Sequence, residues 1–190
     1  MKRKNVLITG GAGFIGHHII YNLLNETNFK IISLDRLDYS GSYSRIQEVI
    51  EQNEQWKKRI KIIWYDLRAE INSITANQIN KPDIVINCAG RVGGILDNSK
   101  YQDEYLFVNT LIGLNLINIS LKYNVKKLIN LGSACIYPKK NKQPIKESYL
   151  LSSYLEPTNE GYALAKISVL KYCEYIKKKF NKDFISLQPA

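Results

Sequence analysis

Residues 5–25 read NVLITGGAGFIGHHIIYNLLN, and this stretch determines the fold that we expect for the whole chain. It opens with a short apolar run, Asn5 to Thr9, whose β-branched residues predict a strand. Four glycines follow within residues 10–16, of which Gly10, Gly13 and Gly16 recur at every third position, and an amphipathic pattern then predicts a helix to about Asn25. This order of strand, glycine loop and helix is the context in which a Gly-x-x-Gly-x-x-Gly spacing becomes informative.

The three glycines have separate expected roles. Gly10 permits a tight turn, Gly13 lets the backbone approach a pyrophosphate, and Gly16 lets the helix pack closely against the strand. Free N–H groups at the helix N-terminus then face the phosphates. We therefore predict a dinucleotide-binding loop that also includes Phe14 and Ile15. The alternative is a plain connection between a strand and a helix.

Strands and helices alternate along the rest of the chain. Further strands are expected at residues 30–34, 61–65, 83–87, 126–131 and 183–187, and helices at 43–57, 70–79, 104–123 and 158–178. With 190 residues, of which 45% are hydrophobic, the chain suits one domain with a sizeable core. The alternation predicts an α/β fold, a doubly wound parallel sheet of the Rossmann type, formed by residues 1–190.

The second expected strand ends at Asp35, about twenty residues beyond the glycine loop, where an acid binds the ribose hydroxyls of NAD. A carboxylate there repels the 2′-phosphate of NADP, so Asp35 favours NAD as the cofactor. The neighbouring Arg36 can bind such a phosphate, which leaves NADP as the alternative. Asp66 and Leu67 follow the third strand and are expected beside the adenine. A solvated loop acid is the other interpretation of Asp66.

A second loop of small residues follows the fourth strand, from Cys88 to Ile95. Its first part, with Ala89 and Gly90, is positioned to pass beneath a cofactor. A flexible connection is the alternative.

Tyr162 and Lys166 lie four residues apart on the last expected helix, so their side chains share one face. An ammonium beside a phenol lowers the pKa of the phenol, which can then exchange a proton with a sugar hydroxyl or ketone near neutral pH. Ser133 ends the fifth strand and can donate to a sugar oxygen, and Lys166 can also hold the nicotinamide ribose. The alternatives are an incidental pair on a surface helix and a turn serine.

The three cysteines are Cys88, Cys135 and Cys173. Cys135 lies two residues after Ser133, and its thiolate can abstract a proton beside a carbonyl. A buried inert thiol is the alternative. The odd number and wide spacing favour reduced thiols in a cytoplasmic protein, and no metal-ligand spacing is seen.

The composition excludes two classes of partner. The net charge of +10 suggests nucleic-acid binding, but the lysines are scattered and form no stripe interleaved with aromatic residues. The positive field favours an anionic substrate instead. No apolar run approaches the roughly 20 residues that span a bilayer, so no membrane association is expected.

Together these motifs resemble the extended short-chain dehydrogenase/reductase family, the NAD-dependent nucleotide-sugar epimerases and dehydratases, over the whole chain. The second half is most similar to the GDP-L-fucose synthase branch, in RVGGI (91–95), LGSACIYP (131–138), QPIKE (143–147) and LEPTNE (155–160). The resemblance implies epimerisation of GDP-4-keto-6-deoxy-mannose followed by reduction with NAD(P)H. It implies Ser133, Tyr162 and Lys166 as the reductase triad, Cys135 as the epimerisation base, and a homodimer through the two long helices.

Three differences separate the chain from that branch. Residues 35–41 look more like the NAD-using dehydratases, whereas the synthases use NADPH. Ala134 stands where the synthases usually carry Ser. The resemblance also implies that the acid histidine and most of the C-terminal substrate domain lie beyond residue 190.

Two alternatives to the synthase reading therefore remain. One is an NAD-dependent 4,6-dehydratase or 4-epimerase, although dehydratases usually carry Thr-Asp-Glu at 133–135. The other is a cofactor-binding or dimerising module without turnover.

Overall fold

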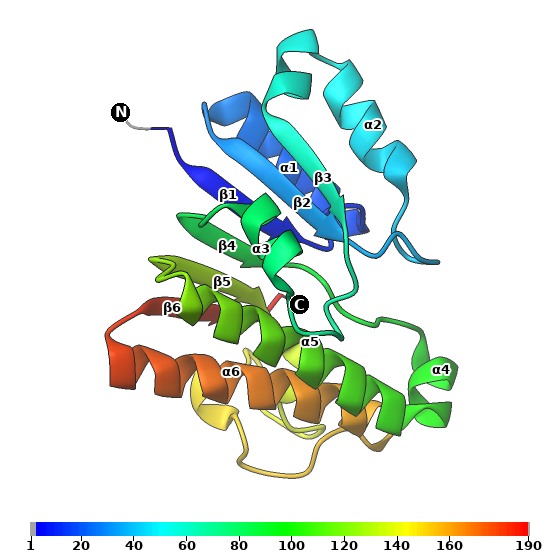
Figure 1. Cartoon of the computed structure of the whole chain (residues 1–190). Helices are drawn as coiled ribbons and strands as arrows, with labels where there is room; N and C mark the ends of the chain where they lie inside the picture. Colours follow the sequence, from blue (N-terminus) through cyan, green and yellow to red (C-terminus); the bar gives the residue numbers. More distant parts are fainter. Residues whose placement is uncertain (1–2, 190) are drawn as a thin grey trace.

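Six parallel strands form one sheet in the order β3-β2-β1-β4-β5-β6 (Figure 1). The computed structural model describes residues 3–189, so the ends of the predicted 1–190 domain lie outside the described residues. The strands are β1 (Asn5–Thr9), β2 (Lys30–Asp35), β3 (Ile60–Trp64), β4 (Ile84–Asn87), β5 (Lys127–Leu131) and β6 (Asp183–Leu187). This order, with its switch between β1 and β4, confirms the predicted doubly wound sheet.

Helices cover both faces of the sheet. They are α1 (Phe14–Glu26), α2 (Tyr43–Glu51), α3 (Ser73–Ile79), α4 (Ile95–Lys100), α5 (Gln102–Lys122) and α6 (Glu160–Phe180), with short 3₁₀ turns η1 (Glu54–Lys58), η2 (Ala134–Ile136), η3 (Glu147–Tyr149) and η4 (Pro157–Asn159). Helices α1 and α2 pack on one face, and α3, α5 and α6 on the other.

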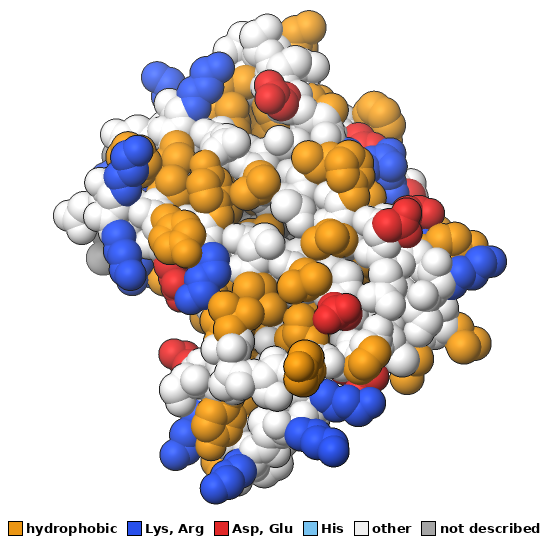
Figure 2. Space-filling view, turned by 90° about the horizontal axis from the view of Figure 1, so that it is seen from below, with side chains coloured by type: hydrophobic (Ala, Val, Ile, Leu, Met, Phe, Trp, Pro, Cys, Tyr) orange, Lys and Arg blue, Asp and Glu red, His pale blue; other side chains and the backbone are white. Residues whose placement is uncertain are grey.

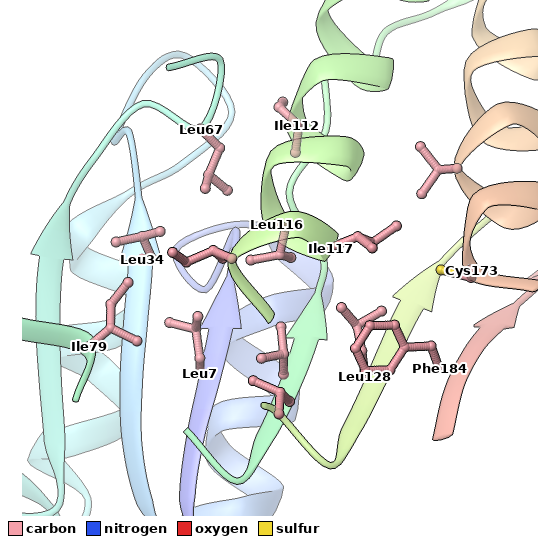
Figure 3. Close-up of a cluster of buried hydrophobic side chains, with 14 of the residues drawn as sticks. Leu7, Leu34, Leu67, Ile79, Ile112, Leu116, Ile117, Leu128, Cys173 and Phe184 are labelled. Atoms are coloured by element: carbon pink, nitrogen blue, oxygen red, sulfur yellow. The ribbon is translucent and has the colours of Figure 1, made fainter. Parts of the chain in front are cut away.

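Alternation along β1 shows how one strand serves both layers. Val6 and Ile8 pack toward α1 and α2, whereas Leu7 points toward α5. Figure 3 shows Leu7 and Leu34 beside Leu116 in the buried hydrophobic cluster that lies between the sheet and helices α3, α5 and α6. Full burial of each such side chain contributes roughly 1.5–3 kcal/mol. This packing fixes the strand ends that carry the site.

Three elements differ from the sequence-based expectation. The helix predicted over 43–57 ends at Glu51, because the Asn53 side chain accepts from Gln55 N at 3.0 Å and starts η1. The helix predicted from residue 70 begins at Ser73, after Asn72, whose side chain caps it. Helix α4 was not predicted: residues 88–95 were treated as a loop, and the helix begins at its last residue.

Helix α5 corrects the expectation that no apolar run is long enough to span a bilayer. Within the described part of the chain, it is the one helix whose length and composition meet that criterion. In this fold it packs against the sheet and alongside α6, and 44% of its apolar window is buried. A Cβ at Gly113 would lie 2.3 Å from Val169 Cγ2, so the two helices approach closely.

Candidate functional site

A cavity of about 310 Å³ opens at the carboxyl ends of β1, β2 and β4. Ligands of such sheets bind at this edge, where the strand order reverses. All the predicted cofactor-binding residues except Lys166 line it, namely Gly10, Gly13, Phe14, Ile15, Gly16, Asp35, Arg36, Asp66, Leu67, Ala89 and Gly90. Four sequence-distant segments are therefore brought to one place.

The glycine loop is shaped by close backbone contacts. Gly10 has a φ of +67°, and a Cβ there would lie 2.7 Å from Ala89 N. A Cβ at Gly16 would lie 2.1 Å from the Gly10 carbonyl oxygen. Gly13 is the N-cap of α1, with no side-chain cap and no acidic residue in the first turn. The N-terminus of α1 thus presents backbone N–H groups to the cavity, as binding of a pyrophosphate requires.

Asp35 holds the loop to the end of β2. Its Oδ2 accepts from Ala12 N at 3.0 Å, and its Oδ1 accepts from Leu37 N at 2.8 Å. Each carboxylate oxygen has a further acceptor site. Asp35 can therefore accept from ribose hydroxyls in the cavity while it keeps both backbone contacts.

Alternating charges line the cavity beyond Asp35. Arg36 pairs with Asp38 and lies 3.5 Å from Asp66 Oδ2, while Arg68 Nε donates to the same Asp66 oxygen at 2.8 Å. The hydrogen bonds from Arg68 lower the pKa of Asp66. Asp66 thus lines the cavity as expected, but two arginines hold its carboxylate. Asp38 and Arg68 were not predicted, although each lies within three residues of a predicted residue at the same strand end, Asp35 or Asp66.

The second small-residue loop is held by a residue that sequence reasoning missed. Asn109 on α5 is buried; its Oδ1 accepts from Arg91 N at 2.9 Å and its Nδ2 donates to Arg91 O at 3.1 Å. A Cβ at Gly90 would lie 2.9 Å from Asn109 Oδ1. An amide on a mostly apolar helix was the available signal, since buried polar groups need partners.

The four predicted catalytic residues lie together at the ends of β5 and α6. Lys166 Nζ donates to Leu131 O at 3.0 Å and lies 5.5 Å from the centroid of the Tyr162 ring. Ser133 Oγ accepts from Cys135 N at 3.2 Å. The hydroxyl of Ser133 and the thiol of Cys135 are both close enough to affect the ionisation of Tyr162.

The ionisation of these groups departs from the sequence-based expectation. Burial raises the pKa of Tyr162 above its usual value, the nearby Cys135 adds to this, and the Ser133 hydroxyl opposes it. Lys166 does not produce the predicted lowering. Burial also lowers the pKa of Lys166 itself, to about 8. Lys166 does not line the cavity, although a Cβ at Gly90 would lie 3.6 Å from its Nζ.

The remaining thiols are unpaired and buried to different degrees. Burial raises the pKa of Cys88 and of Cys173 to about 12, so both thiols are protonated at neutral pH. Across residues 3–189, no group of three or more His, Cys, Asp or Glu side chains is placed to hold a metal ion.

Comparison with known proteins shows which proteins the chain as a whole resembles. The model of the NAD dependent epimerase/dehydratase family matches residues 6–190. The GDP-L-fucose synthase of Sinorhizobium fredii is 35% identical over 98% of this chain and 51% of its own length. That of Escherichia coli is 34% identical over 84% of this chain and 51% of its own length. The chain thus spans about half the length of the curated relatives it matches.

A solved structure has a similar fold and is again about twice as long as this chain. The UDP-N-acetylglucosamine 4-epimerase of Methanobrevibacter ruminantium superposes with a TM-score of 0.79 at 26% identity, covering 99% of this chain and 55% of that one.

Proposed function

The chain belongs to the NAD dependent epimerase/dehydratase family, and from this membership we propose that it is a nucleotide-sugar epimerase/reductase of the GDP-L-fucose synthase kind. The substrate that we propose is GDP-4-keto-6-deoxy-mannose, which is epimerised and then reduced with NAD(P)H. The observation that carries the proposal is the gathering of Ser133, Cys135, Tyr162 and Lys166 near the cavity that the glycine loop and Asp35 line.

The cavity suits a nicotinamide dinucleotide. The α1 N-terminus and the loop around Gly13 would hold the pyrophosphate, and Asp35 would accept from the adenosine ribose. When bound, the dinucleotide supplies the hydride. NAD remains the favoured cofactor, because the carboxylates of Asp35 and Asp38 oppose a 2′-phosphate and the guanidinium of Arg36 is already paired with Asp38.

The proposed proton chemistry follows from the positions of the side chains. Tyr162 donates its phenolic proton to the C4 oxygen during reduction, and Ser133 donates a hydrogen bond to the same oxygen. The raised pKa of Tyr162 keeps this proton in place at neutral pH, so the phenol is available as the proton donor. Lys166 contacts the ring of Tyr162 and would also hold the nicotinamide ribose of a bound dinucleotide.

Cys135 is the proposed epimerisation base. The half-buried thiol lies beside Tyr162, on the turn that also carries Ser133. As a thiolate it would take the proton from the carbon next to the C4 ketone, leaving an enolate. Dehydration is the weaker alternative, because Ser133, Ala134 and Cys135 include no carboxylic acid to expel a C6 hydroxyl.

We also propose that two copies of the chain pair through α5 and α6. These helices expose large apolar side chains, with Phe107 64% and Tyr175 60% accessible. Figure 2, which views the molecule from below, shows apolar side chains exposed on the surface among Lys and Arg side chains. Sedimentation of the chain tests the proposal, and a monomer at all accessible concentrations would contradict it.

A cytoplasmic location is proposed from the three unpaired cysteines.

The test of the proposed function is calorimetric titration of the chain with NAD, NADPH and GDP, followed by a reduction assay on GDP-4-keto-6-deoxy-mannose. Binding of a dinucleotide and of GDP, with turnover, would support the synthase reaction. Binding of a dinucleotide alone would indicate a cofactor-binding module without turnover. Binding of neither would overturn the proposal.

A further inference from the structure

A line of hydrogen-bonded side chains crosses the sheet near the carboxyl ends of its strands. Thr9 Oγ1 donates to Asn87 Oδ1 at 2.7 Å, and Asn87 Nδ2 donates to Asn130 Oδ1 at 2.8 Å. Asn130 Nδ2 then donates to Ser186 Oγ at 2.9 Å. The line runs from β1 through β4 and β5 to β6, which is the spatial order of these strands.

Gln188 extends this line to the proposed catalytic turn. Its Nε2 donates to Ser186 Oγ at 3.2 Å, and its Oε1 accepts from Ser133 N at 2.9 Å. Gly132 leaves room for this amide, since a Cβ there would lie 1.9 Å from Gln188 Oε1. The line thus joins Thr9, which precedes the glycine loop, to Ser133.

We propose that Gln188 is a positioning residue for Ser133, an inference that rests on the proposed catalytic role of that serine. Two backbone bonds flank the contact: Gly132 N donates to Leu187 O at 2.7 Å, and Ala134 N donates to Pro189 O at 3.0 Å. Between them, the side chain of Gln188 accepts the N–H of Ser133, where the regular ladder of β5 and β6 has ended.

The chemistry of the line fixes the orientation of the Gln188 amide. Thr9, Asn87 and Asn130 are buried, so their polar atoms find partners within the line, and the Ser133 N–H at its end can be accepted only by the oxygen of the Gln188 amide. Ser186 Oγ takes N–H groups from two sides, which turns the Gln188 oxygen toward Ser133. The turn that carries Ser133 is then held at a defined distance from the sheet. The Ser133 hydroxyl, which lowers the pKa of Tyr162, is held in place with it.

The experiment compares four proteins by NMR: the native chain, Gln188→Met, Ser133→Ala and Thr9→Val. Methionine keeps the length of Gln188 but neither donates nor accepts through an amide. Thr9→Val breaks the far end of the line and is the matched control. The first readout is hydrogen exchange of the Ser133 amide. The second is the titration of ¹³Cζ-labelled Tyr162 up to about pH 11, assigned with Tyr162→Phe.

We expect the Ser133 amide to exchange about tenfold faster in Gln188→Met, because its hydrogen bond is lost. The Ser133 hydroxyl lowers the pKa of Tyr162, so we also expect that pKa to rise in Ser133→Ala, and to rise by less in Gln188→Met. Thr9→Val should lower thermal stability and leave the Tyr162 titration unchanged. A purely structural role for Gln188 would lower stability in the same way without moving that titration.

Two outcomes overturn the inference and can be told apart. If Ser133→Ala shifts the Tyr162 titration and Gln188→Met does not, Gln188 does not position the serine, and the proposed function is untouched. If Ser133→Ala itself leaves the titration unchanged, the serine does not act on Tyr162. The proposed catalytic pair and the positioning role then fail together.

Discussion

Lys166 lies over the ring of Tyr162, with its Nζ 5.5 Å from the ring centroid and 3.0 Å from the carbonyl oxygen of Leu131. The ammonium therefore acts on the face of the ring and on the backbone of β5. Burial outweighs any assistance to phenolate formation, and the pKa of Tyr162 is raised. In the free protein Tyr162 is thus protonated and can donate a proton, and the contact with Lys166 fixes the position of its ring.

Tyr162→Phe should lower kcat for reduction by about 10²–10⁴-fold, because the proton donor is lost. Dinucleotide affinity should be unchanged, since Tyr162 does not line the cavity. Steady-state kinetics and calorimetry measure the two effects. Tyr175→Phe, an exposed tyrosine on the same helix, is the control and should behave as the native protein. Reduction that survives in Tyr162→Phe would show that another group supplies the proton.

The pH dependence of stability should report the burial of Lys166. Its pKa is about 8 in the folded chain, below the ordinary 10.5, so between these values the unfolded chain binds more protons. The contribution of Lys166 to the free energy of unfolding should therefore rise with pH in this window, by up to about 1.4 kcal/mol per pH unit, while Cys88 and Cys173, whose pKa values are raised to about 12, contribute in the opposite direction above about pH 9. Urea denaturation at several pH values should show this slope reduced in Lys166→Met. The exposed Lys178→Met should keep it, and an equal slope in all three proteins would contradict the assignment.

Asp35→Ala should weaken binding of NAD more than binding of NADP. The variant loses an acceptor for the ribose hydroxyls and removes a charge that repels a 2′-phosphate. Asp38→Asn is the complementary variant. It weakens the ion pair between Asp38 and Arg36, so Arg36 becomes available to a 2′-phosphate and NADP binding should improve while NAD binding changes little. Calorimetry with both dinucleotides measures the ratio. A ratio unchanged in Asp35→Ala would remove this residue from the ribose site.

Cys135→Ser should impair epimerisation more than reduction. Serine keeps the size and the position of the side chain, but its hydroxyl is a much weaker base than a thiolate. Exchange of substrate protons with deuterated water isolates the epimerisation step, and consumption of NAD(P)H measures reduction. Equal losses in both measurements would argue against a separate base.

Gly16→Ala should destabilise the protein by about 1–3 kcal/mol and abolish dinucleotide binding. The added Cβ would lie 2.1 Å from Gly10 O, so the loop and α1 have to move apart. Gly94→Ala is the matched control, because nothing lies within 4 Å of its Cβ position. Thermal unfolding and calorimetry provide the readouts. A Gly16→Ala protein that binds the cofactor normally would show that the loop tolerates the displacement.

Local patterns predicted most of the elements that carry the site. The bounds of β1 and β6 agree with the expected strands at 5–9 and 183–187, and β2 ends at Asp35 as expected. These segments are short apolar runs with clear limits, whose alternation of burial is set by their own residues. The end of α2 and the start of α3 were misplaced, because the capping side chains of Asn53 and Asn72 compete with continued helix.

The sequence by itself determined the order of the elements, the glycine loop and the presence of Asp35, Ser133, Tyr162 and Lys166 at strand ends or on one helix face. These features depend on spacing along a few residues, which a sequence contains in full. Only the tertiary structure decided the direction of the Tyr162 pKa, the pairing of Asp66 with Arg36, and the contact between Gln188 and Ser133. Each of these depends on burial or on a partner at least thirty residues away along the chain, as Arg36 is from Asp66, so packing alone establishes it.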